Sequence, residues 1–197
     1  MGGIDVFDIG EIKDKYNLSN YIETGTGRGV TLSYVLKFGF KTNTSIEIFN
    51  TVYNDALKTF KGENCDIVLG NSYEVLPTVL GKIDGNVLFF LDAHFPGADY
   101  GYRKYGDEKD INKRLPLEME LDCIIKNYDF KGSVFIIDDL RIYEDGPFEA
   151  GNWHRRGELG LDGITFIHKL LDETHTIEKD YRHQGYLIIK PKNTNGR

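Results

Sequence analysis

The chain has few cysteines, few prolines and no long apolar run. Its 197 residues include two cysteines, Cys65 and Cys123, and no cysteine or histidine spacing of the zinc-finger kind. Two isolated cysteines are typical of a reducing compartment, where they act as small core residues. No apolar stretch approaches the length of a membrane helix, and the N-terminus lacks the basic-then-apolar pattern of a signal peptide. These absences predict a cytoplasmic protein without a membrane anchor.

Positive charge is also scarce. The chain carries 24 Lys and Arg against 31 Asp and Glu, and this net charge of −7 argues against a general nucleic-acid-binding surface. A hydrophobic content of 40% and a charged content of 28% are ordinary for a globular protein, and this length buries a sizeable core. We expect one domain over residues 1–197, with a small molecule rather than nucleic acid as its partner.

Three alternating glycines follow a short apolar strand at residues 21–30, which read YIETGTGRGV. Glycines at these positions allow a sharp turn, and the helix start behind them presents free N–H groups to a ligand. The dinucleotide fingerprint G-x-G-x-x-G is not matched, because Val30 occupies its third glycine position. We expect a cofactor loop, and a tight turn without a ligand is the alternative. The expected loop residues are Thr24, Gly25, Thr26, Gly27 and Gly29.

Strand and helix patterns alternate along the rest of the chain. Four apolar runs, at 44–48, 65–72, 86–95 and 133–140, are separated by segments with helical spacing, as in a parallel α/β sheet. Residues 175–181 and 186–190 flank a short turn and predict an antiparallel hairpin. A lead-in helix is expected over residues 1–17. The pattern predicts an α/β fold, a Rossmann-like three-layer sandwich whose mostly parallel seven-stranded sheet ends in an antiparallel hairpin strand.

Polar residues close the predicted strands at 44–48 and 65–72, which are the second and third strands of the chain when the strand before the glycine loop is counted first. Glu47 lies 22 residues after Gly25, and in nucleotide-binding α/β folds an acid at about this spacing binds ribose hydroxyls. Asn71 and Ser72 form a small polar turn after the third strand, and this pair is equally suited to cap the helix that follows.

The pattern Glu-x-Gly-x-Gly-x-Gly resembles motif I of the class I S-adenosylmethionine-dependent methyltransferases. The resemblance implies that Glu23 offsets the cationic groups of S-adenosylmethionine and that Asn71 and Ser72 lie beside its adenine. Family members often carry Asp at the position of Asn71, and an Asn carbonyl can also accept a hydrogen bond. The terminal hairpin is also similar to that family and uncommon in dinucleotide dehydrogenases.

Three carboxylates follow the ends of two neighbouring strands: Asp92 in one case, Asp138 and Asp139 in the other. Like charges at such a place repel unless a cation lies among them, and Mg²⁺ prefers oxygen ligands. The arrangement resembles the metal-dependent O-methyltransferases of the catechol and macrolide-sugar types, which implies that all three hold the metal. For the Asp138–Asp139 pair, a turn or helix cap is the alternative.

The resemblance also implies a mechanism. A metal-bound acceptor hydroxyl loses its proton to a base, and the alkoxide attacks the sulfonium methyl group. His94 is the expected base because it lies close to Asp92 in the sequence, and His154 is the second candidate. Asp92 itself would contact both the metal and the cofactor. A packing role is the alternative for His94.

Two irregular segments, 96–114 and 141–162, follow the strands that end near Asp92 and near Asp138–Asp139. Segments of this length predict substrate or lid loops. Tyr100, Tyr102 and Tyr105 could stack on a ring, and Arg103 could reach an anionic group. The same aromatic residues would also suit the interface of a homo-oligomer.

The sequence therefore predicts an S-adenosylmethionine-dependent methyltransferase that O-methylates a small hydroxylated acceptor, such as a sugar, with Mg²⁺. Alternatives are a metal-independent N- or O-methyltransferase, a nicotinamide-dependent oxidoreductase, a cofactor-binding module without catalysis, and an RNA methyltransferase that uses the arginines of the two loops.

Overall fold

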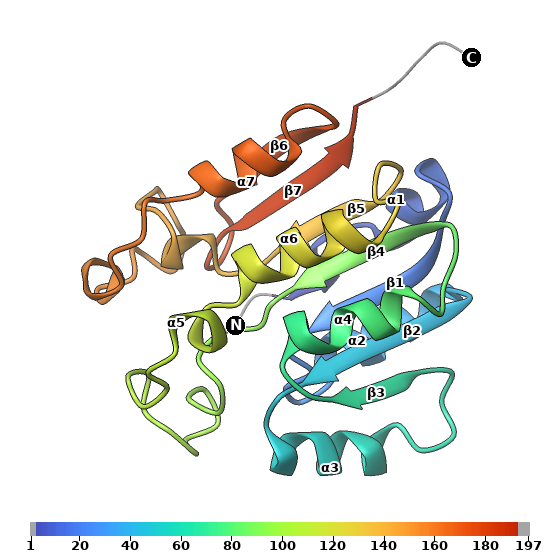
Figure 1. The fold of residues 1–197 in the computed structure, drawn as a ribbon, viewed down its shortest axis with the longest axis horizontal. Helices are drawn as coiled ribbons and strands as arrows, with labels where there is room; N and C mark the ends of the chain where they lie inside the picture. Colours follow the sequence, from blue (N-terminus) through green and yellow to red (C-terminus); the bar gives the residue numbers. More distant parts are fainter. Residues whose placement is uncertain (1–2, 193–197) are drawn as a thin grey trace.

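A seven-stranded sheet forms the centre of the computed structural model, which describes residues 3–192 (Figure 1). The strand order is β3-β2-β1-β4-β5-β7-β6, with β7 antiparallel to both neighbours and every other ladder parallel. The predicted mostly parallel sheet with a terminal hairpin strand is therefore confirmed. The strands are β1 (Leu18–Thr24), β2 (Thr42–Glu47), β3 (Asp66–Leu69), β4 (Asn86–Leu91), β5 (Val134–Ile137), β6 (His175–Asp180) and β7 (Tyr186–Pro191).

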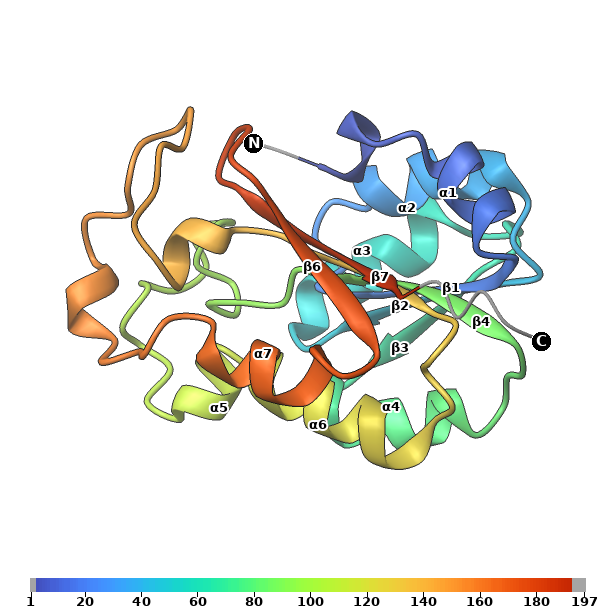
Figure 2. The same cartoon turned by 90° about the horizontal axis from the view of Figure 1, so that it is seen from above.

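Helices cover both faces of the sheet (Figure 2). One face carries α1 (Ile9–Lys15), α2 (Val30–Val35) and α3 (Asn50–Thr59). The other carries α4 (Ser72–Leu80), α6 (Leu117–Asn127) and α7 (Thr165–Leu171), with the short α5 (Ile111–Arg114) leading into α6. No helix in the described part of the chain is long and apolar enough to cross a membrane.

The central strand β4 is apolar from Val87 to Leu91 because both of its faces are covered. Leu88 and Phe90 pack into the core on the α2 side, while Phe89 and Leu91 pack into the core on the α6 side. All four side chains are at most 2% exposed. A parallel strand covered on both faces has no solvent side, so the alternation of polar and apolar residues disappears.

The chain N-terminal to the sheet differs from the single helix expected over 1–17. A 3₁₀ turn at Ile4–Val6 precedes α1, which begins only at Ile9. The Asp8 side chain accepts a hydrogen bond from the Glu11 backbone N–H at 2.9 Å and so defines a new helix start. Residues 1–2 lie outside the described residues.

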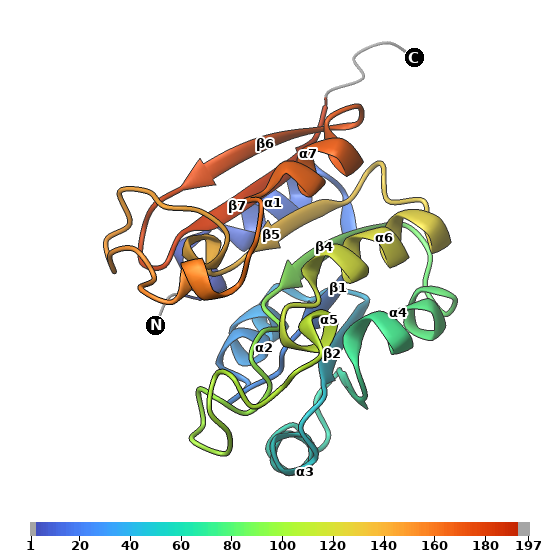
Figure 3. The same ribbon diagram turned by 60° about the vertical axis from the view of Figure 1, so that its left-hand side comes forward.

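The two irregular segments extend beyond the carboxyl ends of β4 and β5 (Figures 1 and 3). They contain α5 and the 3₁₀ turns Leu140–Ile142 and Arg156–Glu158, and otherwise lack regular structure. Their aromatic rings meet: Trp153 lies 5.1 Å from Phe95 and 6.2 Å from Tyr105 between ring centroids. The ends of the parallel strands therefore lie beneath two loops that pack on each other.

Candidate active site

The glycine loop turns directly from β1 into α2. Gly25, Gly27 and Gly29 have φ values of 85°, 53° and 71°, which a residue with a side chain rarely adopts. At Gly25 a Cβ atom would also lie 2.9 Å from the backbone carbonyl oxygen of Asp92. The first glycine therefore lets the loop pack against the end of β4, which brings the predicted cofactor loop next to the predicted catalytic strand.

Glu47 fixes the loop from the neighbouring strand. Its carboxylate accepts hydrogen bonds from the backbone N–H groups of Gly27, at 3.1 Å, and Phe49, at 2.7 Å. Burial raises the pKa of Glu47, and these two bonds oppose that rise. The backbone carbonyl of Glu47 also accepts from Gly70 N–H at 2.9 Å, which ties the β3–α4 turn to the same point. Glu47 thus lies at the strand end where the ribose-binding acid is predicted.

Glu23 lies beneath the loop rather than on its surface. It is 1% exposed, and its two carboxyl oxygens accept 2.6 Å hydrogen bonds from the hydroxyls of Tyr21 and Ser45. Ser45 in turn lies 2.6 Å from the hydroxyl of Thr26 in the glycine loop. Burial raises the pKa of Glu23 to about 7, against the effect of the two hydroxyls. Glu23 therefore supports the loop through Ser45 and Thr26.

Asn71 and Ser72 begin α4 at the third strand end, and both are buried. The Asn71 side chain makes no hydrogen bond to the free helix N–H groups, and its amide donates to Glu74 Oε1 at 3.2 Å instead. The polar pair therefore lies at the predicted edge of the sheet, where Asn71 occupies the N-cap position without side-chain capping.

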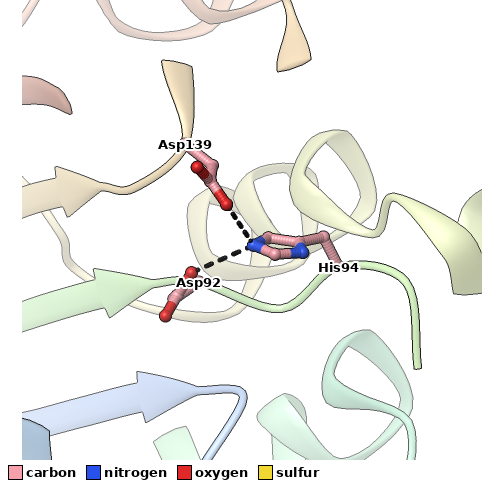
Figure 4. Close-up of side chains that lie close together, drawn as sticks. All are labelled: Asp92, His94 and Asp139. Atoms are coloured by element: carbon pink, nitrogen blue, oxygen red, sulfur yellow. Dashed lines mark ion pairs between the residues drawn. The ribbon is translucent and has the colours of Figure 1, made fainter. Parts of the chain in front are cut away.

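Asp92, His94 and Asp139 converge at the ends of β4 and β5 (Figure 4). His94 Nε2 lies 2.8 Å from Asp139 Oδ2 and 3.3 Å from Asp92 Oδ1. Burial lowers the pKa of His94, but the two carboxylates outweigh it and hold that pKa well above 6.5. The imidazolium thus supplies positive charge between the two acids. One potential ligand atom from each residue lies within 4.8 Å of the others, which is compatible with a metal ion.

Two predicted residues are not among the three converging side chains, although burial and the nearby charges of Asp92 and Asp139 raise the pKa of Asp138. Asp138 is buried, and its Oδ1 accepts a 2.7 Å hydrogen bond from the backbone N–H of Asp139 rather than joining the three converging side chains. His154 is exposed on the 141–162 segment. The sequence placed all three acids at one strand edge, but the backbone turn at Asp139, with φ of 55°, sends the neighbouring carboxylates to different places.

The predicted loop residues separate into two groups. Tyr102 stacks on Phe49 with ring centroids 5.1 Å apart, Arg103 lies over the same ring, and the Tyr100 hydroxyl lies directly over Gly27. Tyr105 instead donates to Asp99 at 2.7 Å and packs in the aromatic cluster with Trp153. Tyr100 therefore covers the glycine loop, and Tyr102 and Arg103 pack on Phe49 just before α3, whereas Tyr105 lies between the two irregular segments.

Buried polar atoms without a hydrogen-bond partner gather at this edge of the sheet. Among the described residues eight such side-chain atoms occur, and Asn43 Oδ1 is the one remote from the strand ends that form the site. In native proteins an unpaired buried polar atom usually meets a water, an ion or a ligand. The other seven are Thr24 Oγ1, His94 Nδ1, Arg114 Nε, Glu120 Oε1, Glu120 Oε2, Asp139 Oδ1 and Arg141 Nε.

Glu120 is the site residue that sequence reasoning missed. It lies on α6, is 1% exposed, and shares the inward face with Leu117, Leu121 and Ile124. Burial raises its pKa to about 7, and the hydroxyls of Ser72 and Thr24 act in the opposite direction. An acid on the apolar face of a helix was the signal that could have identified it, because Glu is rarely buried without a partner.

Comparison with solved structures shows the same fold in several O-methyltransferases. One is a Staphylococcus aureus protein provisionally assigned as a caffeoyl-CoA O-methyltransferase, with a TM-score of 0.62 and 16% identity over 93% of this chain and 81% of that one. Another is TomG from Streptomyces achromogenes in complex with S-adenosylmethionine, with a TM-score of 0.56 and 14% identity over 93% and 78%.

A third is NcsB1 from neocarzinostatin biosynthesis, in complex with S-adenosylmethionine and 2-hydroxy-5-methyl naphthoic acid. Its TM-score is 0.56 at 15% identity, over 94% of this chain and 52% of NcsB1, so this chain matches about half of that protein. No protein-family model matches the chain, and no curated protein is found as a relative. The chain therefore has the Rossmann-like fold of the class I S-adenosylmethionine-dependent O-methyltransferases.

Proposed function

We propose that this protein is an S-adenosylmethionine-dependent O-methyltransferase acting on a small hydroxylated acceptor. The observation that carries the proposal is the position of the Asp92–His94–Asp139 cluster directly beside the glycine loop, at the carboxyl ends of β1, β4 and β5. Ligands of open α/β sheets bind at this edge. The two sets of residues would thus hold methyl donor and acceptor next to each other, and such positioning supplies much of the catalysis of a two-substrate reaction.

The donor would lie along the ends of β1, β2 and β3. Gly25, Gly27 and Gly29 allow the tight turn whose backbone would border the methionine part, and Glu47 lies where it can accept hydrogen bonds from ribose hydroxyls. Asn71 and Ser72 would then border the base. The complexes of TomG and NcsB1 with S-adenosylmethionine support this choice of cofactor.

The acceptor would lie over the Asp92–His94–Asp139 cluster, beneath the two irregular segments. Once the imidazolium between the two carboxylates has released its proton, neutral His94 would accept the acceptor's hydroxyl proton at Nε2; the oxygen then attacks the methyl carbon, the sulfur–methyl bond breaks and S-adenosylhomocysteine forms. A sugar is one such acceptor. NcsB1 holds a hydroxylated naphthoic acid, which supports a small hydroxylated molecule of this general kind.

A divalent metal fits the same cluster. Asp92 and Asp139 would hold it, because both present a carboxylate within reach of a shared ion; Asp139 Oδ1 makes no hydrogen bond and lies 3.7 Å from Arg141 Nε. Mg²⁺ accepts such oxygen ligands together with waters. When bound, it would lower the pKa of a coordinated hydroxyl. His94, rather than Asp138, completes the converging set.

A metal-independent methyltransferase is the second candidate, and one observation favours it. His94 already lies between the two carboxylates and supplies the positive charge that a metal would otherwise provide. In that form the Asp92–His94–Asp139 arrangement would orient the acceptor through charged hydrogen bonds alone.

Calorimetric titration with S-adenosylhomocysteine and, separately, NADH tests the proposal, each in Mg²⁺ and in chelator. We expect S-adenosylhomocysteine to bind and NADH not to bind. Binding of NADH alone, or of neither ligand, would contradict the methyltransferase assignment. Given cofactor binding, methyl transfer to candidate acceptors in chelator separates the two forms, because the metal-dependent one loses activity.

A further inference from the structure

Residues 97–103, here called the strap, follow β4 and contact two other loops at the same edge of the sheet. The Tyr100 hydroxyl lies so close to Gly27, in the β1–α2 loop, that a Cβ atom at Gly27 would overlap it. The Tyr102 ring stacks on Phe49, in the β2–α3 loop, with ring centroids 5.1 Å and planes 16° apart. The strap therefore lies on both loops that carry the predicted methyl-donor site.

Glu47 is bonded to the same two residues that the strap covers. Its carboxylate accepts the backbone N–H groups of Gly27 and Phe49, and the residue is only 6% exposed. Burial and the charge of Glu47 raise the pKa of the Tyr100 hydroxyl to about 12, which agrees with a position close to that carboxylate. A ribose bound by Glu47 would thus need space that the strap now takes.

The strap is a turn that carries its own backbone hydrogen bonds. The N–H groups of Tyr102 and Arg103 donate to the Gly97 carbonyl at 3.0 and 3.2 Å, whereas no backbone hydrogen bond among the described residues joins the strap to either loop. Side chains hold it to Phe49: the Tyr102 ring, itself 51% exposed, and the Arg103 guanidinium, 5.5 Å from the ring centroid. A turn attached in this way can open locally without disturbing the sheet.

We propose that the strap is the gate of the donor site, which opens to admit S-adenosylmethionine and to release S-adenosylhomocysteine, with Tyr100 as the side chain that blocks the entrance over Gly27. The inference rests on the proposed methyltransferase function and deepens it, because it adds control of cofactor exchange. It also assigns this part of the 96–114 segment to the donor rather than to the acceptor.

A gate has a kinetic signature that a fixed wall of the site lacks. Opening precedes both association and dissociation of the cofactor, so both rate constants scale with the population of the open strap. A change that destabilises only the closed strap should therefore raise both rate constants by the same factor. The dissociation constant, which is their ratio, should stay nearly unchanged.

Gly101→Ala is the variant that makes this change most cleanly. Gly101 has φ of 72°, and an added Cβ would meet no atom within 4 Å, so alanine strains the closed strap without a clash, and an open strap can relax. We expect both rate constants for S-adenosylhomocysteine, measured by surface plasmon resonance, to rise roughly fivefold. Gly151→Ala is the matched control, with φ of 74° and equally open space in the 141–162 segment, and its rates should equal those of the wild type.

Tyr102→Ala tests the same gate through a side chain. Loss of the stack on Phe49 should raise both rate constants roughly two- to tenfold. Wild-type rates in Gly101→Ala and Tyr102→Ala, an equal acceleration in Gly151→Ala, or faster dissociation without faster association would overturn the gate and leave the proposed function intact. A wild type that does not bind S-adenosylhomocysteine would overturn the proposed function and, with it, this inference.

Discussion

His94 Nε2 lies 2.8 Å from Asp139 Oδ2, although 45 residues separate them in the chain. The contact joins the ends of two adjacent parallel strands, and Asp92 approaches the same nitrogen at 3.3 Å. Asp139 reaches it from a left-handed backbone conformation, with φ of 55°, that a residue with a side chain adopts only at a cost. The fold thus stabilises a strained residue to bring its carboxylate to the histidine.

The first prediction concerns the metal. Asp139→Asn should weaken binding of Mn²⁺, used as a probe for Mg²⁺, by more than about tenfold, because it removes a charged ligand from the converging set. Asp138→Asn should have a smaller effect, since its carboxyl accepts the backbone N–H of Asp139. Calorimetric titration of both variants measures this. Equal losses in the two variants would contradict the assignment of Asp139 over Asp138.

The second prediction concerns the glycine loop. Gly27→Ala should lower the affinity for S-adenosylhomocysteine by more than about tenfold, because the added methyl group would overlap the Tyr100 hydroxyl and displace the side chain that covers the loop, at a backbone position with positive φ. Gly39→Ala is the matched control: its φ is 63° and nothing lies within 4 Å of the added atom. It should cost about 1 kcal/mol of stability through backbone strain alone. If both variants bind the cofactor equally well, Gly27 does not border the pocket.

The third prediction concerns pH. The folded protein raises the pKa of Glu120 from 4.5 to about 7, so it holds a proton that the unfolded chain releases between these values. Stability from this group is therefore complete below about pH 4.5 and is lost as pH rises through about 7. In the wild type this loss should lower the free energy of unfolding by as much as about 3 kcal/mol. Glu120→Gln should not show this part of the decrease. Urea unfolding at about pH 5 and about pH 8 measures it, and an unchanged slope would show that Glu120 titrates normally.

The fourth prediction concerns the two irregular segments. Trp153→Ala should increase amide hydrogen exchange in both 99–110 and 150–160, because the indole joins Phe95 and Tyr105 across the segments. The stability loss should be about 1–3 kcal/mol, as for a half-buried aromatic side chain. Tyr102→Ala is a control, since its ring stacks on Phe49 instead. Faster exchange in only one segment would mean that Trp153 does not couple them.

Much of this architecture can be predicted from the sequence. The apolar run at 86–95 and the hairpin at 175–190 predicted β4 and the terminal β6–β7 pair, because buried parallel strands and tight turns have strong local signatures. The N-terminal segment was harder: a single side-chain cap at Asp8 starts α1 and divides the expected helix.

The sequence alone also determined which residues stand at the carboxyl edge of the sheet. Strand ends follow from local pattern, so Glu47, Asn71, Asp92 and Asp139 were placed there without knowledge of any contact. Their pairing was decided by the tertiary structure. After β5, Asp139 contacts His94 whereas Asp138 accepts the backbone N–H of Asp139, and Glu120 is buried on the inward face of α6. Strand position is local information, whereas the direction of a side chain at a strand end depends on elements far away in the chain.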